Sequence, residues 1–218
     1  MNKKYELIKD DFIIINDNKL YRIKALRDFG TVREGDIGGY IEGEYNLSHK
    51  GNAWVCGNAL IYGNAKVYGN AWVYGNARVY GSALVFGNVR IYGNARVSEG
   101  ARVYGDAEVY GNARVFGYAQ VYGKARVYGN AEVFGNAKVF GSAQVYEDAR
   151  VYGDAEVSGK ARVYGNALVF EIARVSGNAK VSEYALVYGN AKVYGNAKVG
   201  GKAQISGFTN LYGDSEVY

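Results

Sequence analysis

A six-residue repeat runs without insertion or deletion through most of this chain. From residue 51 to residue 218 the sequence consists of 28 consecutive hexads of the form Gly-Asn-Ala-x-Val-Tyr. Ala and Val stand two residues apart, so they share one face of an extended strand, while x and Tyr point to the other face. Gly and Asn accept the left-handed backbone that a sharp corner needs. The repeat therefore predicts short strands joined by tight corners, which is a parallel β-helix.

The fourth position of the hexads indicates how many hexads make one coil. Basic residues recur there at nearly every second hexad. With four hexads per coil, Arg78, Arg102 and Arg126 would stack, and like charges directly opposite each other are destabilising. With three hexads per coil, one face reads Arg90, Glu108, Arg126, and the signs alternate. We therefore predict 18 residues per coil and a triangular prism of about nine coils, at about 4.8 Å per coil.

The first fifty residues lack the repeat. Apolar runs at 12–15 and 20–26, separated by a polar stretch, predict a β-hairpin. The open end of a β-helix exposes unpaired strands, and terminal caps are the usual protection. We expect this segment to fold over Trp54 and Trp72, which stack on the first coils.

The predicted architecture is all-β. It consists of an N-terminal β-hairpin cap domain at residues 1–50 and a hexapeptide-repeat β-helix at residues 51–218.

Composition excludes several function classes. The single Cys excludes a disulfide framework, and the single His excludes a multi-histidine metal centre. No apolar run approaches the roughly 18 residues of a membrane span, and the first six residues lack the apolar core of a signal peptide. We therefore expect no metal, no cofactor, no membrane contact and a cytoplasmic location. The net charge of +5 falls entirely on the repeats.

The hexad Val73-Tyr74-Gly75-Asn76-Ala77-Arg78 resembles the hexapeptide-repeat superfamily, in which a small residue follows an aliphatic one four positions later. This resemblance implies a left-handed β-helix and trimers of parallel rods. The segment from Leu20 to Val55 looks like uncharacterised bacterial and prophage hexapeptide-repeat proteins, which often carry a transferase label. That resemblance implies a bacterial, phage-encoded origin, but a fold alone does not define a function.

Acyltransferases of the superfamily use a His base and an extruded loop. The hexads contain neither, and His49 lies where the cap meets the repeats. His49 is a weak catalytic candidate that would need a partner chain to complete its site. The alternative is a junction residue without chemistry, and we expect a protein that is not an enzyme.

Basic residues stack without alternation at two places. Arg78, Arg96 and Arg114 fall on consecutive coils of one face, where like charges call for an anion, a carboxylate or a partner. A second basic region, near the end of the chain, contains Lys180, Lys192 and Lys198. These residues are the candidate sites for an anionic ligand, whereas nucleic acid is not expected. The alternative is a solvated basic surface.

Outward apolar residues gather late in the repeats, and an exposed apolar patch usually marks an interface. The candidate interface residues are Leu168, Phe170, Ile172, Tyr184, Leu186 and Tyr188.

The leading hypothesis is a non-enzymatic, homo-oligomeric β-helical scaffold or binding protein, with a trimer favoured. Its partner would be a host protein or an anionic, nucleotide-like small molecule, which a phage-derived protein could sequester. One alternative is a hexapeptide-repeat acyltransferase, and another is a self-assembling, filament-forming structural protein.

Overall fold

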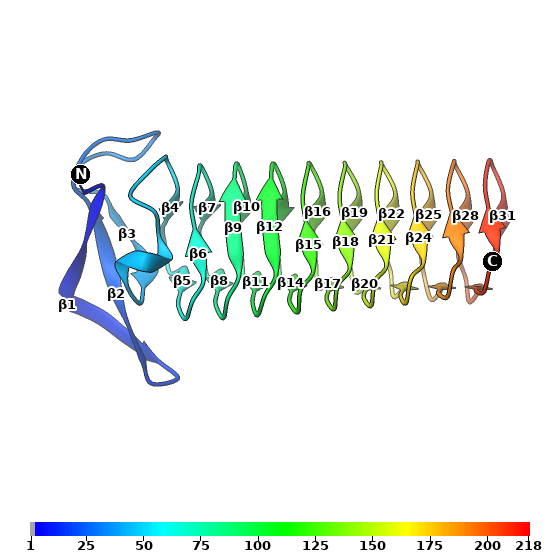
Figure 1. Ribbon diagram of the computed structural model, residues 1–218, viewed down its shortest axis with the longest axis horizontal. Coiled ribbons are helices and arrows are strands. Elements are labelled where there is room, and N and C mark those ends of the chain that lie inside the picture. Colours follow the sequence, from blue (N-terminus) through cyan, green and yellow to red (C-terminus); the bar gives the residue numbers. More distant parts are fainter. Residues whose placement is uncertain (1–2) are drawn as a thin grey trace.

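The computed structural model describes residues 3–218 and shows a straight parallel β-helix with a hairpin across its N-terminal end (Figure 1). The described part of the chain has no α-helix, and its one 3-10 helix is η1 (Glu44–Asn46). Consequently none of its helices could span a membrane. Residues 1–2, where the stretch examined for a signal peptide begins, lie outside the described residues.

Three sheets form the faces of the prism, which we number in the order of their first strands along the whole chain. Face 2 is ten-stranded, face 1 is twelve-stranded and face 3 is nine-stranded. Face 1 comprises β1 (Tyr5–Ile15), β2 (Asn18–Ala25), β3 (Ile37–Ile41), β5 (Leu60–Ile61), β8 (Arg78–Val79), β11 (Arg96–Val97), β14 (Arg114–Val115), β17 (Glu132–Val133), β20 (Arg150–Val151), β23 (Leu168–Val169), β26 (Leu186–Val187) and β29 (Gln204–Ile205).

Face 2 comprises β4 (Trp54–Val55), β7 (Trp72–Val73), β10 (Arg90–Ile91), β13 (Glu108–Val109), β16 (Arg126–Val127), β19 (Gln144–Val145), β22 (Arg162–Val163), β25 (Lys180–Val181), β28 (Lys198–Val199) and β31 (Glu216–Val217). Face 3 comprises β6 (Lys66–Val67), β9 (Leu84–Gly87), β12 (Arg102–Gly105), β15 (Gln120–Val121), β18 (Lys138–Val139), β21 (Glu156–Val157), β24 (Arg174–Val175), β27 (Lys192–Val193) and β30 (Asn210–Leu211).

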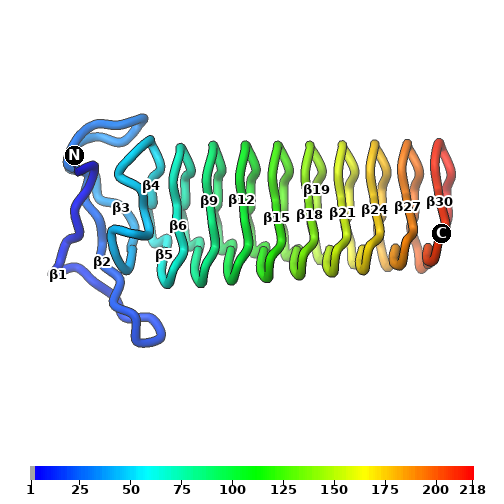
Figure 2. Tube along the Cα trace, viewed as in Figure 1, coloured from blue at the N-terminus to red at the C-terminus, as the bar shows by residue number. Residues whose placement is uncertain are grey.

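The repeats stack in the predicted register. Arg90 is the partner of Glu108, and Glu108 is the partner of Arg126, so successive coils are 18 residues apart. The triangular β-helix with 18-residue coils is therefore confirmed, and the equal spacing of the coils is visible in Figure 2. Its left-handedness stays a prediction.

The interior is made of the Ala and Val of the hexads. Those from Ala53 to Val193 are almost completely buried, as expected for residues that share the inward face. The corner glycines have φ near +70°, and a Cβ at Gly111 would lie 3.0 Å from the backbone of Gly129. Glycine therefore satisfies both the left-handed conformation and the close approach of the coils.

Four corners carry Glu in place of Gly, with φ between 58° and 60°. In each case the carboxylate accepts a hydrogen bond from the backbone N–H one coil further on, as Glu99 Oε2 does from Gly117 N at 2.9 Å. This bond offsets the strain of a side chain in the left-handed region. The four residues are Glu99, Glu147, Glu171 and Glu183.

The outer surface carries two kinds of side-chain ladder. Aromatic rings stack with centroids about 5 Å apart, as in the run from Tyr74 to Tyr164. Asn side chains donate along the axis from one coil to the next, and the acceptor that ends each of these runs is an Asp. The Asp residues are Asp106, Asp148, Asp154 and Asp214.

The N-terminal segment contains the predicted hairpin. Strands β1 and β2 pair antiparallel, with Asn16 and Asp17 at positive φ in the turn. Strand β3 then pairs parallel with β5, with Tyr40 opposite Leu60, so solenoid pairing begins before the first hexad. This extra turn brings the β-helix to about ten coils. The division into domains at residue 50 stays a prediction.

The cap covers one of the two tryptophans that we expected beneath it. Trp54 is 2% exposed and meets the ring of Phe29 at 5.3 Å and that of Tyr5 at 6.4 Å. Trp72 is half-buried and packs against the core. The expectation was wrong for Trp72, because the segment that crosses Trp54 turns back at Gly30.

Candidate functional site

The three arginines predicted to stack on face 1 lie in register. Arg96 is the strand partner of both Arg78 and Arg114. Arg114 Nη1 lies 2.8 Å from Glu132 Oε1, so the charge at one end of the stack is balanced. Within residues 3–218, neither Arg78 nor Arg96 forms an ion pair. Two adjacent positive charges therefore remain on this face.

The aromatic ladder of face 1 is interrupted beside Arg96. The rings of Tyr62 and Tyr80 stack at 5.0 Å, and a second run begins with Phe116. Between the runs stands Ser98, two residues after Arg96, with 6% of its surface exposed. The small side chain leaves the guanidinium of Arg96 without a ring as its neighbour along the strand.

The three lysines of the second basic region do not form one site. Lys180 and Lys198 are strand partners on face 2, whereas Lys192 lies on face 3 beside Arg174 and Asn210. Lys198 forms an ion pair with Glu216, and this hydrogen bond raises the pKa of the exposed lysine. Among the described residues, no carboxylate lies within ion-pair distance of Lys180 or Lys192.

Five of the six candidate interface residues lie on or beside face 1. Leu168 and Leu186 are strand partners, and the rings of Phe170 and Tyr188 stack beside them at 5.0 Å. Tyr184 is 62% exposed at the corner before β26, whereas Ile172, 48% exposed, lines hollows on face 3 together with Arg174. Ile172 therefore does not belong to the apolar surface of face 1.

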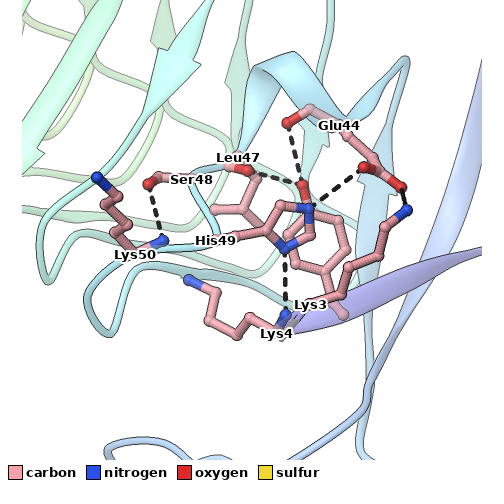
Figure 3. A network of polar contacts seen from close by, with 8 residues as sticks. Lys3, Lys4, Glu44, Leu47, Ser48, His49 and Lys50 are labelled. Carbon is pink, nitrogen blue, oxygen red and sulfur yellow. Dashed lines mark hydrogen bonds and ion pairs between the residues drawn. The ribbon is translucent and has the colours of Figure 1, made fainter. Parts of the chain in front are cut away.

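His49 lies between the hairpin and the first coil, as Figure 3 shows. Its ring stacks on Tyr5, with centroids 4.3 Å apart. The backbone N–H of Lys4 donates to Nδ1 at 3.2 Å, and Nε2 lies 3.3 Å from Glu44 Oε2. Lys3 also binds Glu44, and this hydrogen bond is the largest cause of a lowered pKa for that carboxyl.

These contacts define the chemistry of the imidazole. Because Nδ1 accepts the Lys4 N–H, the neutral ring carries its proton on Nε2 and donates it to Glu44. A general base needs a free lone pair directed at a substrate, and here the lone pair of Nδ1 is already used. The geometry of His49 therefore fits the alternative of a junction residue that joins the cap to the first coil.

A groove that sequence reasoning missed lies where the cap meets face 2. It has a volume of about 550 Å³ and is lined by Gly30, Thr31, Asn52, Cys56, Asn70, Trp72, Tyr74 and Arg90. Cys56 is partly exposed and lines this groove. A signal was present in the sequence: Cys56 stands at the position where most hexads carry Tyr or Phe.

Within residues 3–218, no group of three or more His, Cys, Asp or Glu side chains could hold a metal ion.

The fold defines the chain as a repeat protein of the parallel β-solenoid class. A family model described as the YdcK beta-solenoid repeat matches it at residues 59–75, 71–87, 89–105, 107–123, 119–133 and 143–159. All these segments lie within the hexads, and the match supports a repeat β-helix protein. The hexapeptide-repeat superfamily and its transferase label stay predictions. A search of curated proteins finds no match.

Proposed function

We propose that this protein is a non-enzymatic, homo-oligomeric β-solenoid that binds an anionic partner on face 1. The observation that carries the proposal is the register of Arg78 and Arg96, which stack as adjacent positive charges and form no ion pair with any residue from 3 to 218. The partner is a phosphate-bearing small molecule such as a nucleotide, or an acidic surface of another protein.

The physical support is the cost of holding two guanidinium groups on neighbouring strands. Strand pairing fixes their backbones about 4.8 Å apart, and like charges at that separation repel. At other positions on the prism a carboxylate between the basic residues offsets this cost: Glu108, for example, lies 3.5 Å from Arg126 and 3.9 Å from Arg90. An anion bound between Arg78 and Arg96 would remove the repulsion, and guanidinium groups bind phosphate oxygens through paired hydrogen bonds.

For self-association we propose that the apolar surface around Leu168 and Leu186 binds a second copy of the chain. An apolar patch on a flat face suits another rod lying alongside. A trimer of parallel rods, the arrangement that the sequence resemblance implies, would bury this surface once per subunit. Leu186→Glu should therefore shift the native mass from an oligomer to a single chain, whereas an unchanged oligomer would reject this surface.

Native mass spectrometry of the protein purified directly from cells tests the anion site. We expect the wild type to carry extra mass, and Arg78→Glu to lose it while keeping the oligomer. Arg150→Glu is the matched control, because Arg150 lies on the same face beside Glu132, outside the stack. An Arg78→Glu protein that keeps every ligand would contradict the proposal.

The two alternative functions have separate tests. Turnover of acetyl-CoA that His49→Ala abolishes would favour the acyltransferase over a binding protein. Filaments that grow with protein concentration in negative-stain images would favour the structural polymer, and discrete particles would count against it.

A further inference from the structure

The groove between the cap and face 2 lies on a different face from the arginine stack, and its shape is fixed by the fold. Phe29 and Val32 exchange two backbone hydrogen bonds of 3.0 and 2.9 Å across a tight turn. Gly30, at the tip of that turn, has φ +53° and lies against Asn52: a Cβ on it would be 3.4 Å from that of Asn52. Phe29 anchors the turn on Trp54. One wall of the groove is therefore held rigidly in place.

The floor of the groove is aromatic. Trp72 lies in register between Trp54 and Arg90. Within residues 3–218 the indole of Trp72 has no stacked ring, whereas that of Trp54 has two aromatic neighbours. Tyr74 adds a second ring at the side, above the short Cys56 side chain. Exposed indole and phenol faces in a concave site are suited to a flat ring.

The charge in the groove is positive. Arg90 has a 65% exposed side chain, and its nearest carboxylate oxygen, on Glu108, is 3.9 Å away. Glu108 lies closer to Arg126, at 3.5 Å, so one carboxylate serves two guanidinium groups. Arg90 is thus left with charge to offer to an anion. An adjoining hollow of about 230 Å³, which shares Thr31, Cys56 and Trp72 with the groove, is also lined by the carboxylate of Asp36.

Two amide side chains complete the lining. Asn70 donates to Asn88 at 3.0 Å and so begins one of the ladders that run along the corners. Asn52, one coil earlier, is not joined to it by a side-chain hydrogen bond in the described structure. The Oδ1 of Asn70 and the amide of Asn52 are therefore available to the polar edge of a ligand.

We infer that this groove is a binding site for a small heteroaromatic anion. The flat ring stacks on Trp72, its acidic group binds Arg90, and its polar edge meets the amides of Asn52 and Asn70. Burial raises the pKa of the Cys56 thiol, so the thiol stays protonated and acts as lining. The site is independent of the one proposed at Arg78 and Arg96.

The test uses fluorescence of the full chain with Trp54→Phe, which leaves Trp72 as the only tryptophan. The probes are adenosine monophosphate, indole-2-carboxylate and quinoline-2-carboxylate, each compared with its neutral counterpart: adenosine, indole and quinoline. We expect at least one acid to quench Trp72 with saturation, and to bind about tenfold or more tightly than its neutral form. If no acid binds, or if acid and neutral form bind equally, the inference is wrong.

Two variants assign the binding to the groove. Arg90→Gln should remove the preference for the acid, whereas the matched change Arg126→Gln, on the same face but outside the groove, should leave it unchanged. Cys56→Tyr restores the ring that most hexads carry at this position and should fill the hollow beneath Tyr74, so it should block binding while the thermal midpoint is kept. Binding that survives both Arg90→Gln and Cys56→Tyr would overturn the assignment. Loss of binding in Arg78→Glu alone would place the ligand on face 1.

Discussion

The cap and the repeats are stabilised in different ways. In the cap, single residues make several buried contacts: Lys4 is fully buried and donates to Ala53 O at 2.7 Å, and buried Asn46 donates to Gly63 O and Ala65 O, each at 2.9 Å. In the repeats, the same modest contact recurs on coil after coil. In the cap, a few residues therefore make most of the stabilising contacts, whereas in the repeats these contacts are spread evenly along the chain.

The cap and the repeats also differ in where their charged groups lie. The buried ammonium of Lys4 is satisfied by backbone oxygen, and burial together with nearby Arg27 lowers its pKa to about 8. Charges on the repeats remain at the surface and pair along the faces, as Lys138 and Arg174 do on either side of Glu156. Surface pairs of this kind each contribute little, about 1 kcal/mol or less.

High pH should produce the largest effect, and it should act in opposite directions on the tyrosine ladder of the repeats and on Lys4 of the cap. Burial raises the pKa of several stacked tyrosines, that of Tyr146 to about 12 from 10.0. Unfolded tyrosines lose their protons near pH 10 while the folded ladder keeps them, so stability falls as pH rises from about 10 to 12. We expect cooperative alkaline unfolding, followed by circular dichroism and by tyrosinate absorbance.

The ionisation of Lys4 changes the stability of the protein with pH in the opposite direction. Unfolded, it keeps its proton up to about 10.5, whereas folded it loses it above about 8, so its contribution to stability rises between these values. The urea midpoint of the wild type should rise relative to that of Lys4→Met between pH 8 and 9.5. Parallel curves for the two proteins would contradict this.

An Asn→Ala substitution in the cap and one in the repeats should give the next largest difference in the free energy of unfolding. Asn46→Ala leaves two carbonyls and the N–H of Gly43 without their partner inside the protein, at a cost of about 3 kcal/mol. Asn112→Ala removes an exposed member of a ladder and should cost less than about 1 kcal/mol. Urea unfolding of both variants measures the difference, and equal losses would remove the distinction between cap and repeats.

Loss of one ring tests the ladder itself. Tyr110 stacks on Tyr92 and on Tyr128 with both centroids 4.8 Å away, so Tyr110→Ala should cost about 1–3 kcal/mol. Tyr118 is 72% exposed and stacks on no ring of the described chain, so Tyr118→Ala should stay within about 0.5 kcal/mol. Thermal midpoints of the two variants that coincide would show that stacking contributes nothing.

The corner glutamates should give the smallest effect. Glu99→Gly relieves the left-handed backbone but loses the hydrogen bond to Gly117, so the two terms should nearly cancel. Glu99→Ala loses the bond and keeps the strain, at a cost of about 1 kcal/mol. A variant Glu99→Gly that is clearly less stable than Glu99→Ala would reverse this explanation.

The sequence predicted the repeats far better than the cap. Position in the hexad determines burial, and the alternation of Arg90, Glu108 and Arg126 was enough to define the coil. The cap depends on contacts between distant residues, such as Lys4 with Ala53, for which no period exists. For the same reason the stacked arginines were predictable, while the groove under the Gly30 turn was not.

Because each coil has 18 residues, the position of a residue in the sequence determines both its face and its height along the axis. Gain or loss of 18 residues would slide every downstream side chain by one step of about 4.8 Å along the axis and leave it on its face. Gain or loss of six would turn the same side chains to the next face, because three hexads complete one coil. Duplication within such a gene can therefore move a whole binding surface along the axis or around it, while the interior keeps its packing of Ala and Val.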